Sequence, residues 1–140
     1  MTTSSSLASY TTYQVVSLTT SDIAGLTTAQ LATLSADNVA VLTSNQVIAL
    51  TTAQAKALSS SQVAAFTSSQ WAAIETADLA ALSTAAVAAI GTGSLSVIST
   101  AKIAALTSAQ VASLTTAQMQ GLSTNQVVGL STAQVAALKS

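Results

Sequence analysis

Large apolar residues recur along the chain with a period of eight. The first position of each octad holds mostly Leu and the sixth mostly Val, Leu or Ile, while Ser, Thr and Gln dominate positions 2, 3 and 5. The unit approximates Leu-Thr-Thr-Ala-Gln-Val-Ala-Ala, and sixteen complete copies run from residue 10 to residue 137 without insertion or deletion. A fixed period indicates a repeat architecture in which each unit packs mainly against other units.

Each octad carries the signals of a helix start. Position 2 is Ser or Thr in 14 of the 16 octads, and position 5 is Gln in 10. Ser or Thr followed three residues later by Gln is a capping box, and the apolar residues at positions 1 and 6 then occupy the two sites of a hydrophobic staple. The pattern therefore predicts one short helix and one corner in every octad.

Clear examples of both features are spread along the chain. The predicted capping pairs are Thr27 with Gln30, Thr107 with Gln110, and Ser131 with Gln134. The predicted core staples are Leu26 with Leu31, Phe66 with Trp71, Leu106 with Val111, and Leu130 with Val135.

Two other folds compete with a solenoid of short helices. In one continuous helix, eight residues turn through about 800°, so the apolar stripe slips by about 80° per octad and never forms a face. A β-solenoid with 16-residue coils is favoured by Thr and Val but opposed by Ala at positions 4, 7 and 8 and by the Gln spacing. The prediction is an all-α solenoid or superhelix of short helical segments, with the β-solenoid as the alternative.

Composition excludes most chemistry. The 140 residues include 3 Lys or Arg, 4 Asp or Glu, no His and no Cys. The usual zinc, haem, thiolate and Ser-His-Asp chemistries have no residues to act with, so we predict no enzyme activity, cofactor, metal site or small-molecule substrate. No basic surface exists for nucleic acid, and no apolar run approaches the ~20 residues that span a membrane.

The acidic residues fall in predicted first helical turns, where the helix dipole favours negative charge. They are Asp22, Asp37, Glu75 and Asp78, and we expect Glu75 and Asp78 to form a capping box together.

Adjacent octads in the second half of the chain depart from the consensus at Ala86, Gly91, Ser94 and Lys102. Lost caps and added Gly predict a loosened or bent segment here, rather than a phosphate loop. The three lysines occupy different octad positions and are expected to be solvated: Lys56, Lys102 and Lys139.

The octads resemble arrays of the same type in large bacterial surface or secreted proteins, and the match covers residues 10–137. The resemblance implies a structural role and an extracellular or cell-surface location, although the first residues carry no secretory signal. A narrower stretch, residues 122–129, is similar to the opening of a TAL-effector repeat, but the longer repeat and basic surface of that family are missing.

The ends of the array suggest a function. Residues 1–9 form a polar partial repeat, and residues 138–140 begin an octad that is not completed. An uncapped repeat exposes apolar surface, and open ends that meet head to tail make fibres. We therefore expect the chain to assemble with itself into a filament or sheath. A binding module that presents a Ser/Thr ladder to ice or a glycan, and a passive spacer, are the alternatives. The predicted assembly surface comprises Leu7, Tyr10, Leu130, Val135 and Leu138.

Overall fold

The computed structural model describes residues 7 and 9–138, and within them it confirms the all-helical solenoid. Each octad contributes one short helix, and the described residues contain no strand, so the β-solenoid alternative is wrong. The helices are α1 (Thr12–Val16), α2 (Thr20–Ala24), α3 (Thr28–Ala32), α4 (Ala36–Ala40), α5 (Ser44–Ile48), α6 (Thr52–Ala57), α7 (Ser60–Ala64), α8 (Ser68–Ala73), α9 (Thr76–Ala81), α10 (Thr84–Ala88), α11 (Thr92–Leu95), α12 (Thr100–Ala104), α13 (Ser108–Ala112), α14 (Thr116–Gly121), α15 (Thr124–Val128) and α16 (Thr132–Ala137).

The chain restarts its helix at the same place in every octad. Thr27, at position 2, has an extended backbone with φ −73° and ψ 159°, and its side chain accepts a hydrogen bond from the Gln30 amide. Both bonds of a capping box are present in eleven of the described helices. No described residue has a positive φ, so ordinary residues form the corners.

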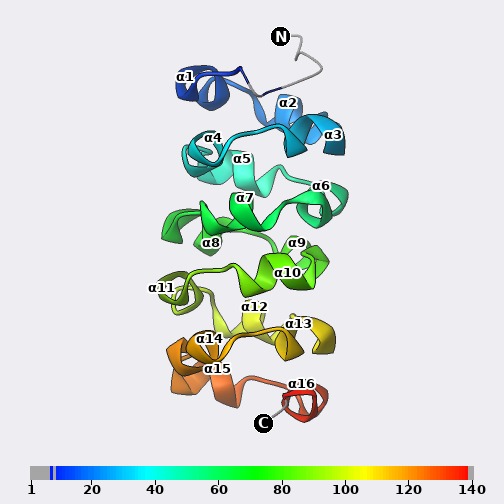
Figure 1. Cartoon of the computed structure of the whole chain (residues 1–140), viewed down its shortest axis with the longest axis vertical. Helices are drawn as coiled ribbons and strands as arrows, with labels where there is room; N and C mark the ends of the chain where they lie inside the picture. Colours follow the sequence, from blue (N-terminus) through cyan, green and yellow to red (C-terminus); the bar gives the residue numbers. More distant parts are fainter. Residues whose placement is uncertain (1–6, 8, 139–140) are drawn as a thin grey trace.

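The helices wind into a rod, with α1 and α16 at opposite ends (Figure 1). Each helix packs against the third helix along the chain, as α6 does against α9 and α7 against α10. Positions 1 and 6 point inward and form one continuous core, in which Val63 and Leu79 are fully buried. No single helix of five or six residues could bury its apolar side chains alone, so the stacking of successive coils stabilises the fold.

Two glycines occupy opposite environments. A Cβ on Gly93 would meet nothing within 4 Å, whereas a Cβ on Gly129 would collide with the Cγ2 of Thr100. Gly129 therefore marks a close approach of two coils, while Gly93 only weakens its short helix.

These environments predict opposite effects of the same substitution. We expect Gly93→Ala to raise the free energy of unfolding by about 0.5–1 kcal/mol, because alanine favours the helix. We expect Gly129→Ala to lower it by about 1 kcal/mol or less, because the exposed Thr100 side chain must leave its position to admit the methyl group. Urea denaturation followed by circular dichroism measures both, and a change of the same sign in both variants would contradict the assignment.

Candidate functional site

The described residues contain no enclosed site for a ligand. They form no pocket and hold no group of three His, Cys, Asp or Glu side chains that could bind a metal ion. No helix among them is long and apolar enough to cross a bilayer. The most specific polar arrangement in this part of the chain is instead a series of buried glutamines.

Gln54 shows the arrangement. Its Oε1 accepts a hydrogen bond from the Thr51 amide at 2.9 Å, and its Nε2 donates to the carbonyls of Ile23 and Leu26, both at 2.8 Å. The side chain is only 2% exposed. Both ends of the amide are therefore satisfied inside the rod, and one residue starts its own helix and also bonds to the previous coil.

The same bonds recur along the chain, and we call the set the glutamine ladder. In each case Nε2 donates to the carbonyls 28 and 31 residues earlier. The ladder consists of Gln46, Gln54, Gln62, Gln70, Gln110, Gln118, Gln126 and Gln134. One coil therefore takes between three and four octads, and each Gln lies over a corner of the coil before it.

The capping pairs predicted from the sequence are present, but the second role of the glutamines was missed. The structure places both bonds of the box at Thr107 and Gln110 and at Ser131 and Gln134. A signal for the second role did exist. Glu completes a capping box as well as Gln does, yet no octad has Glu at position 5. Only the amide carries N–H donors for the next coil.

Position 5 is more varied in the first four octads, where it holds Gln14, Asp22, Gln30 and Asn38. Asn38 donates from Nδ2 to the Tyr10 carbonyl at 2.8 Å, which is a shorter version of the ladder bond. Asp22 accepts from the Thr19 amide at 3.0 Å, and the bonds from the Thr19 amide and hydroxyl lower the pKa of this carboxyl. Asp37 lies exposed in α4, while Ser35 caps that helix.

The predicted capping box of Glu75 and Asp78 is wrong. The Glu75 side chain makes no cap hydrogen bond, and Asp78 is turned inward, where it is 3% exposed and its Oδ2 has no hydrogen-bond partner. Burial, and secondarily the charge of Glu75, raise the pKa of Asp78 to about 6. The pattern failed here because position 5 faces the previous coil as well as its own helix start.

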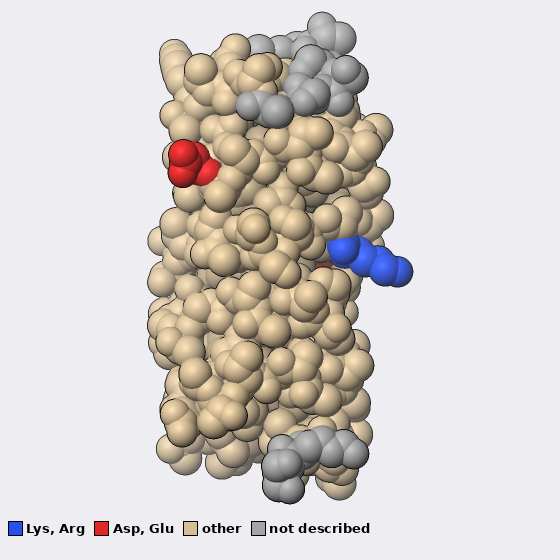
Figure 2. Space-filling model, viewed as in Figure 1, with Lys and Arg blue, Asp and Glu red and all other residues tan. Residues whose placement is uncertain are grey.

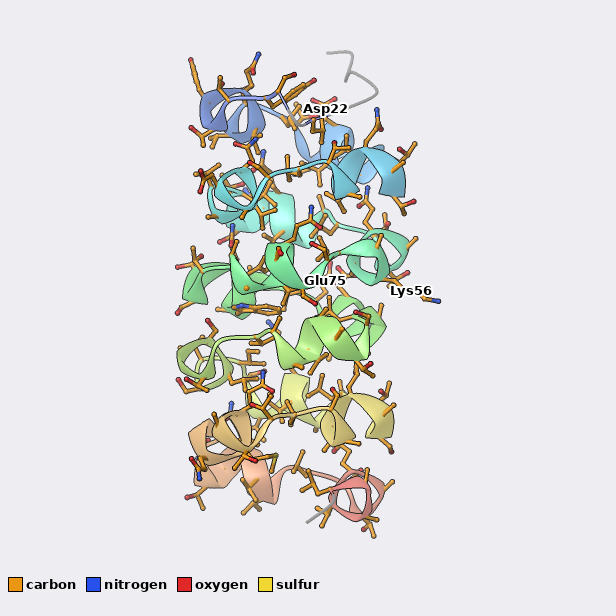
Figure 3. The ribbon with its side chains drawn as sticks, in the orientation of Figure 1. Asp22, Lys56 and Glu75 are labelled. Atoms are coloured by element: carbon orange, nitrogen blue, oxygen red, sulfur yellow. The ribbon has the colours of Figure 1, made fainter. Side chains whose placement is uncertain are left out.

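Lys102 is also at position 5, and its side chain lies partly exposed at the surface of the rod. Its Nζ donates to the Ala72 carbonyl at 2.6 Å, so it replaces part of a ladder bond. Lys56 does lie exposed, and its side chain points away from the rod (Figure 3). Lys139 lies outside the described residues.

Most of the predicted staple residues lie in the core. Phe66 and Trp71 pack together with ring centroids 4.9 Å apart. Val135 was predicted to be a core residue but is 51% exposed, because no later coil among the described residues covers it. The buried members of the predicted set are Leu26, Leu31, Phe66, Trp71, Leu106, Val111 and Leu130.

The residues of the predicted assembly surface also fall into a buried and an exposed group. Leu7 and Leu130 are 0% and 8% exposed, so neither offers open surface in the single chain. Tyr10 and Leu138 are partly buried and pack against the core. Val135 is the one predicted residue that is largely exposed among those described.

The fold and the ladder together define a helical solenoid of octads tied by buried glutamines. A family model of the ALTTAQ repeat matches residues 15–52, 71–108, 87–124 and 108–140, which together cover more than half of the chain. The chain therefore belongs to the ALTTAQ repeat family. No curated protein and no solved structure matches it.

Proposed function

We propose that this chain is a structural element without catalytic function that stacks end to end with further copies into a filament. The observation that carries the proposal is the exposure of apolar residues on the last coil. Val127, Val128 and Val135 are 44%, 77% and 51% exposed, whereas Val63 and Val111, at the same octad position as Val127 and Val135, are fully buried. Internal coils bury the position 6 residues against the next coil, and a coil from a second copy would bury Val127 and Val135 in the same way.

The polar groups of the two outermost coils support the same arrangement. In the described residues, the carbonyls of Val127 and Leu130 receive no ladder bond, and the exposed Gln14 completes its capping box without an acceptor for Nε2. One face thus offers acceptors and the other offers at least one donor. A contact between two different faces does not close on itself and therefore elongates. These faces belong to the outermost coils of an array of any length.

The surface of the rod favours association with a like surface. Few charged side chains lie on the face shown in Figure 2, and the whole chain has a net charge of −1. Electrostatic repulsion between copies is therefore weak. The resemblance to arrays of bacterial surface or secreted proteins supports an extracellular or cell-surface location for such a filament.

The geometry favours a structural role over a flat binding surface for ice or a glycan. The ladder spacing of 28 and 31 residues is not a multiple of eight, so octads of successive coils are staggered. Equivalent Ser and Thr hydroxyls are therefore distributed around the rod instead of aligning in one row. The position 2 hydroxyls, such as that of Thr107, already accept a cap hydrogen bond.

Assembly is tested by charging the exposed end of the rod. We expect the 140-residue chain to form long polymers at micromolar concentration, and Val127→Lys with Val135→Lys to raise the concentration needed for polymers at least about tenfold. Ile48→Lys with Val97→Lys is the matched control, because both residues are 45% exposed on internal coils. This control should polymerise like the parent chain. Sedimentation velocity and negative-stain microscopy measure the outcome, and a parent chain that stays monomeric would instead indicate a passive spacer.

A further inference from the structure

We propose that the rod opens reversibly at one internal seam, where α9–α11 pack on α6–α8, and that Asp78 makes this opening depend on pH. The seam is defined as the contact between residues 47–74 and residues 75–105. The proposal goes beyond the filament and does not depend on it, because it concerns contacts inside a single chain.

The glutamine ladder stops at this seam. In the octads of α9–α12, position 5 is occupied by Asp78, Ala86, Ser94 and Lys102 instead of Gln. The spacing of 28–31 residues places these positions opposite residues 47–74. Of the four, only Lys102 donates a hydrogen bond across the seam among the described residues. The backbone carbonyls opposite Asp78, Ala86 and Ser94 receive no ladder bond from these side chains.

The rod on either side of the seam is tied at every octad. Four glutamines from residue 46 to residue 70 bond to residues 15–42, and four from residue 110 to residue 134 bond to residues 79–106. The ladder therefore divides the array into two blocks of eight octads, residues 10–73 and 74–137. Separating the blocks breaks fewer hydrogen bonds than separating coils within a block.

The helices on the C-terminal side of the seam are also poorly capped. The N-cap residues Glu75 and Gly91 make no side-chain cap hydrogen bond. In addition, α11 has only four residues, whereas α14, which packs against it, has six. A missing cap costs a short helix about 1 kcal/mol, so α9 and α11 begin less stably than the capped helices on either side of them.

Asp78 adds a titratable group to the seam. Asn38 occupies the same octad position as Asp78 and is the amide counterpart of an aspartate. Its Nδ2 donates to the carbonyl of Tyr10, 28 residues earlier. A protonated Asp78 is equally short and also carries a donor, whereas its carboxylate carries none and would face the carbonyl oxygens near Leu50. The neutral form therefore holds the seam closed, and the charged form weakens it.

The charged groups around Asp78 do not neutralise it. Glu75 lies at the start of the same helix, and its negative charge further disfavours the ionised form of Asp78. From α6 comes Lys56, which is exposed, and from α12 comes Lys102, whose Nζ is bonded to the Ala72 carbonyl. The pKa of Asp78 is about 6 in the closed rod against an ordinary 3.8. The closed seam is therefore most stable below pH 3.8 and loses stability as the pH rises through 6.

Hydrogen exchange of the full chain, followed by mass spectrometry and corrected for intrinsic rates, tests the seam. We expect amides of residues 75–105 to be at least about tenfold less protected than those of residues 42–73 at pH 8. The opening equilibrium of the seam should rise about tenfold from pH 5 to pH 8, as the two pKa values require. Uniform protection along the rod would overturn the proposal.

Three single variants separate the seam from a general effect on folding. Asp78→Asn keeps the size of the side chain and removes its titratable group, so the pH dependence of the opening should disappear. Part of the difference in protection between residues 75–105 and residues 42–73 should remain. Asp78→Gln should extend the ladder and raise protection at pH 8. Asp22→Gln is the matched control, because Asp22 is also an acidic position 5 residue but lies partly exposed in its capping box. A pH dependence that persists in Asp78→Asn, or that disappears in Asp22→Gln, would show that Asp78 is not responsible.

Discussion

Replacing Gln54 by alanine is expected to lower the free energy of unfolding by about 2–4 kcal/mol, because one side chain serves two coils. The substitution removes the bonds to the Thr51 amide and to the carbonyls of Ile23 and Leu26. The Ile23 carbonyl still accepts from the Leu26 amide, but the Leu26 carbonyl and the Thr51 amide lose the bonds that satisfied them. Two backbone groups would then be left unpaired within the rod, and each costs about 1–3 kcal/mol.

Urea denaturation of Gln54→Ala, followed by circular dichroism, measures this loss. Gln14→Ala is the control, since Gln14 forms the same capping box but is exposed and makes no ladder bond among the described residues. It should cost about 1 kcal/mol or less. Equal losses in the two variants would show that the bonds between coils contribute nothing to stability.

The short helices were predictable because the information that starts them is local. Thr27 and Gln30 are three residues apart, and the hydrogen bonds between them form within one turn of helix. The apolar residues at positions 1 and 6 follow the same reasoning, since a helix of five or six residues can turn both of them inward. Nothing distant is needed to decide between helix and strand in such an octad.

The ladder could not be predicted in the same way, because it depends on how far the chain advances in one coil. The reach of 28 and 31 residues follows from the dihedral angles at the corners and from the packing of the core, and a single octad encodes neither quantity. Asp78 and Lys102 show the consequence. Asp78 was assigned to its own helix start and Lys102 to the solvent, and neither assignment included the contact that position 5 makes with the preceding coil.

The distribution of glutamine becomes informative once the reach is known. Position 5 varies in the first four octads, and Gln is constant in the next four. The same order recurs in the second half of the chain, where four varied octads precede four with Gln. The sequence thus has a longer period of 64 residues superimposed on the octad, and the seam lies where the second period begins.

Replacing Trp71 by alanine is expected to lower the free energy of unfolding by about 3–5 kcal/mol, the usual cost of removing a large buried aromatic side chain. Trp71 is fully buried, and its ring lies 4.9 Å from that of Phe66, centroid to centroid. The loss combines the transfer of the indole from the core with a cavity that the short helices around it cannot close without shifting the coils.

Trp71→Phe should behave very differently, with a change of less than about 1 kcal/mol. The indole Nε1 is buried without a hydrogen-bond partner, which costs about 1–3 kcal/mol that a phenyl ring does not incur. This gain offsets the smaller volume of phenylalanine, which leaves a cavity worth a similar amount. Since Trp71 is the only tryptophan in the chain, circular dichroism and not fluorescence must follow urea denaturation in both variants. A loss in Trp71→Phe as large as that in Trp71→Ala would show that the indole N–H is bonded in solution, for example to a buried water molecule.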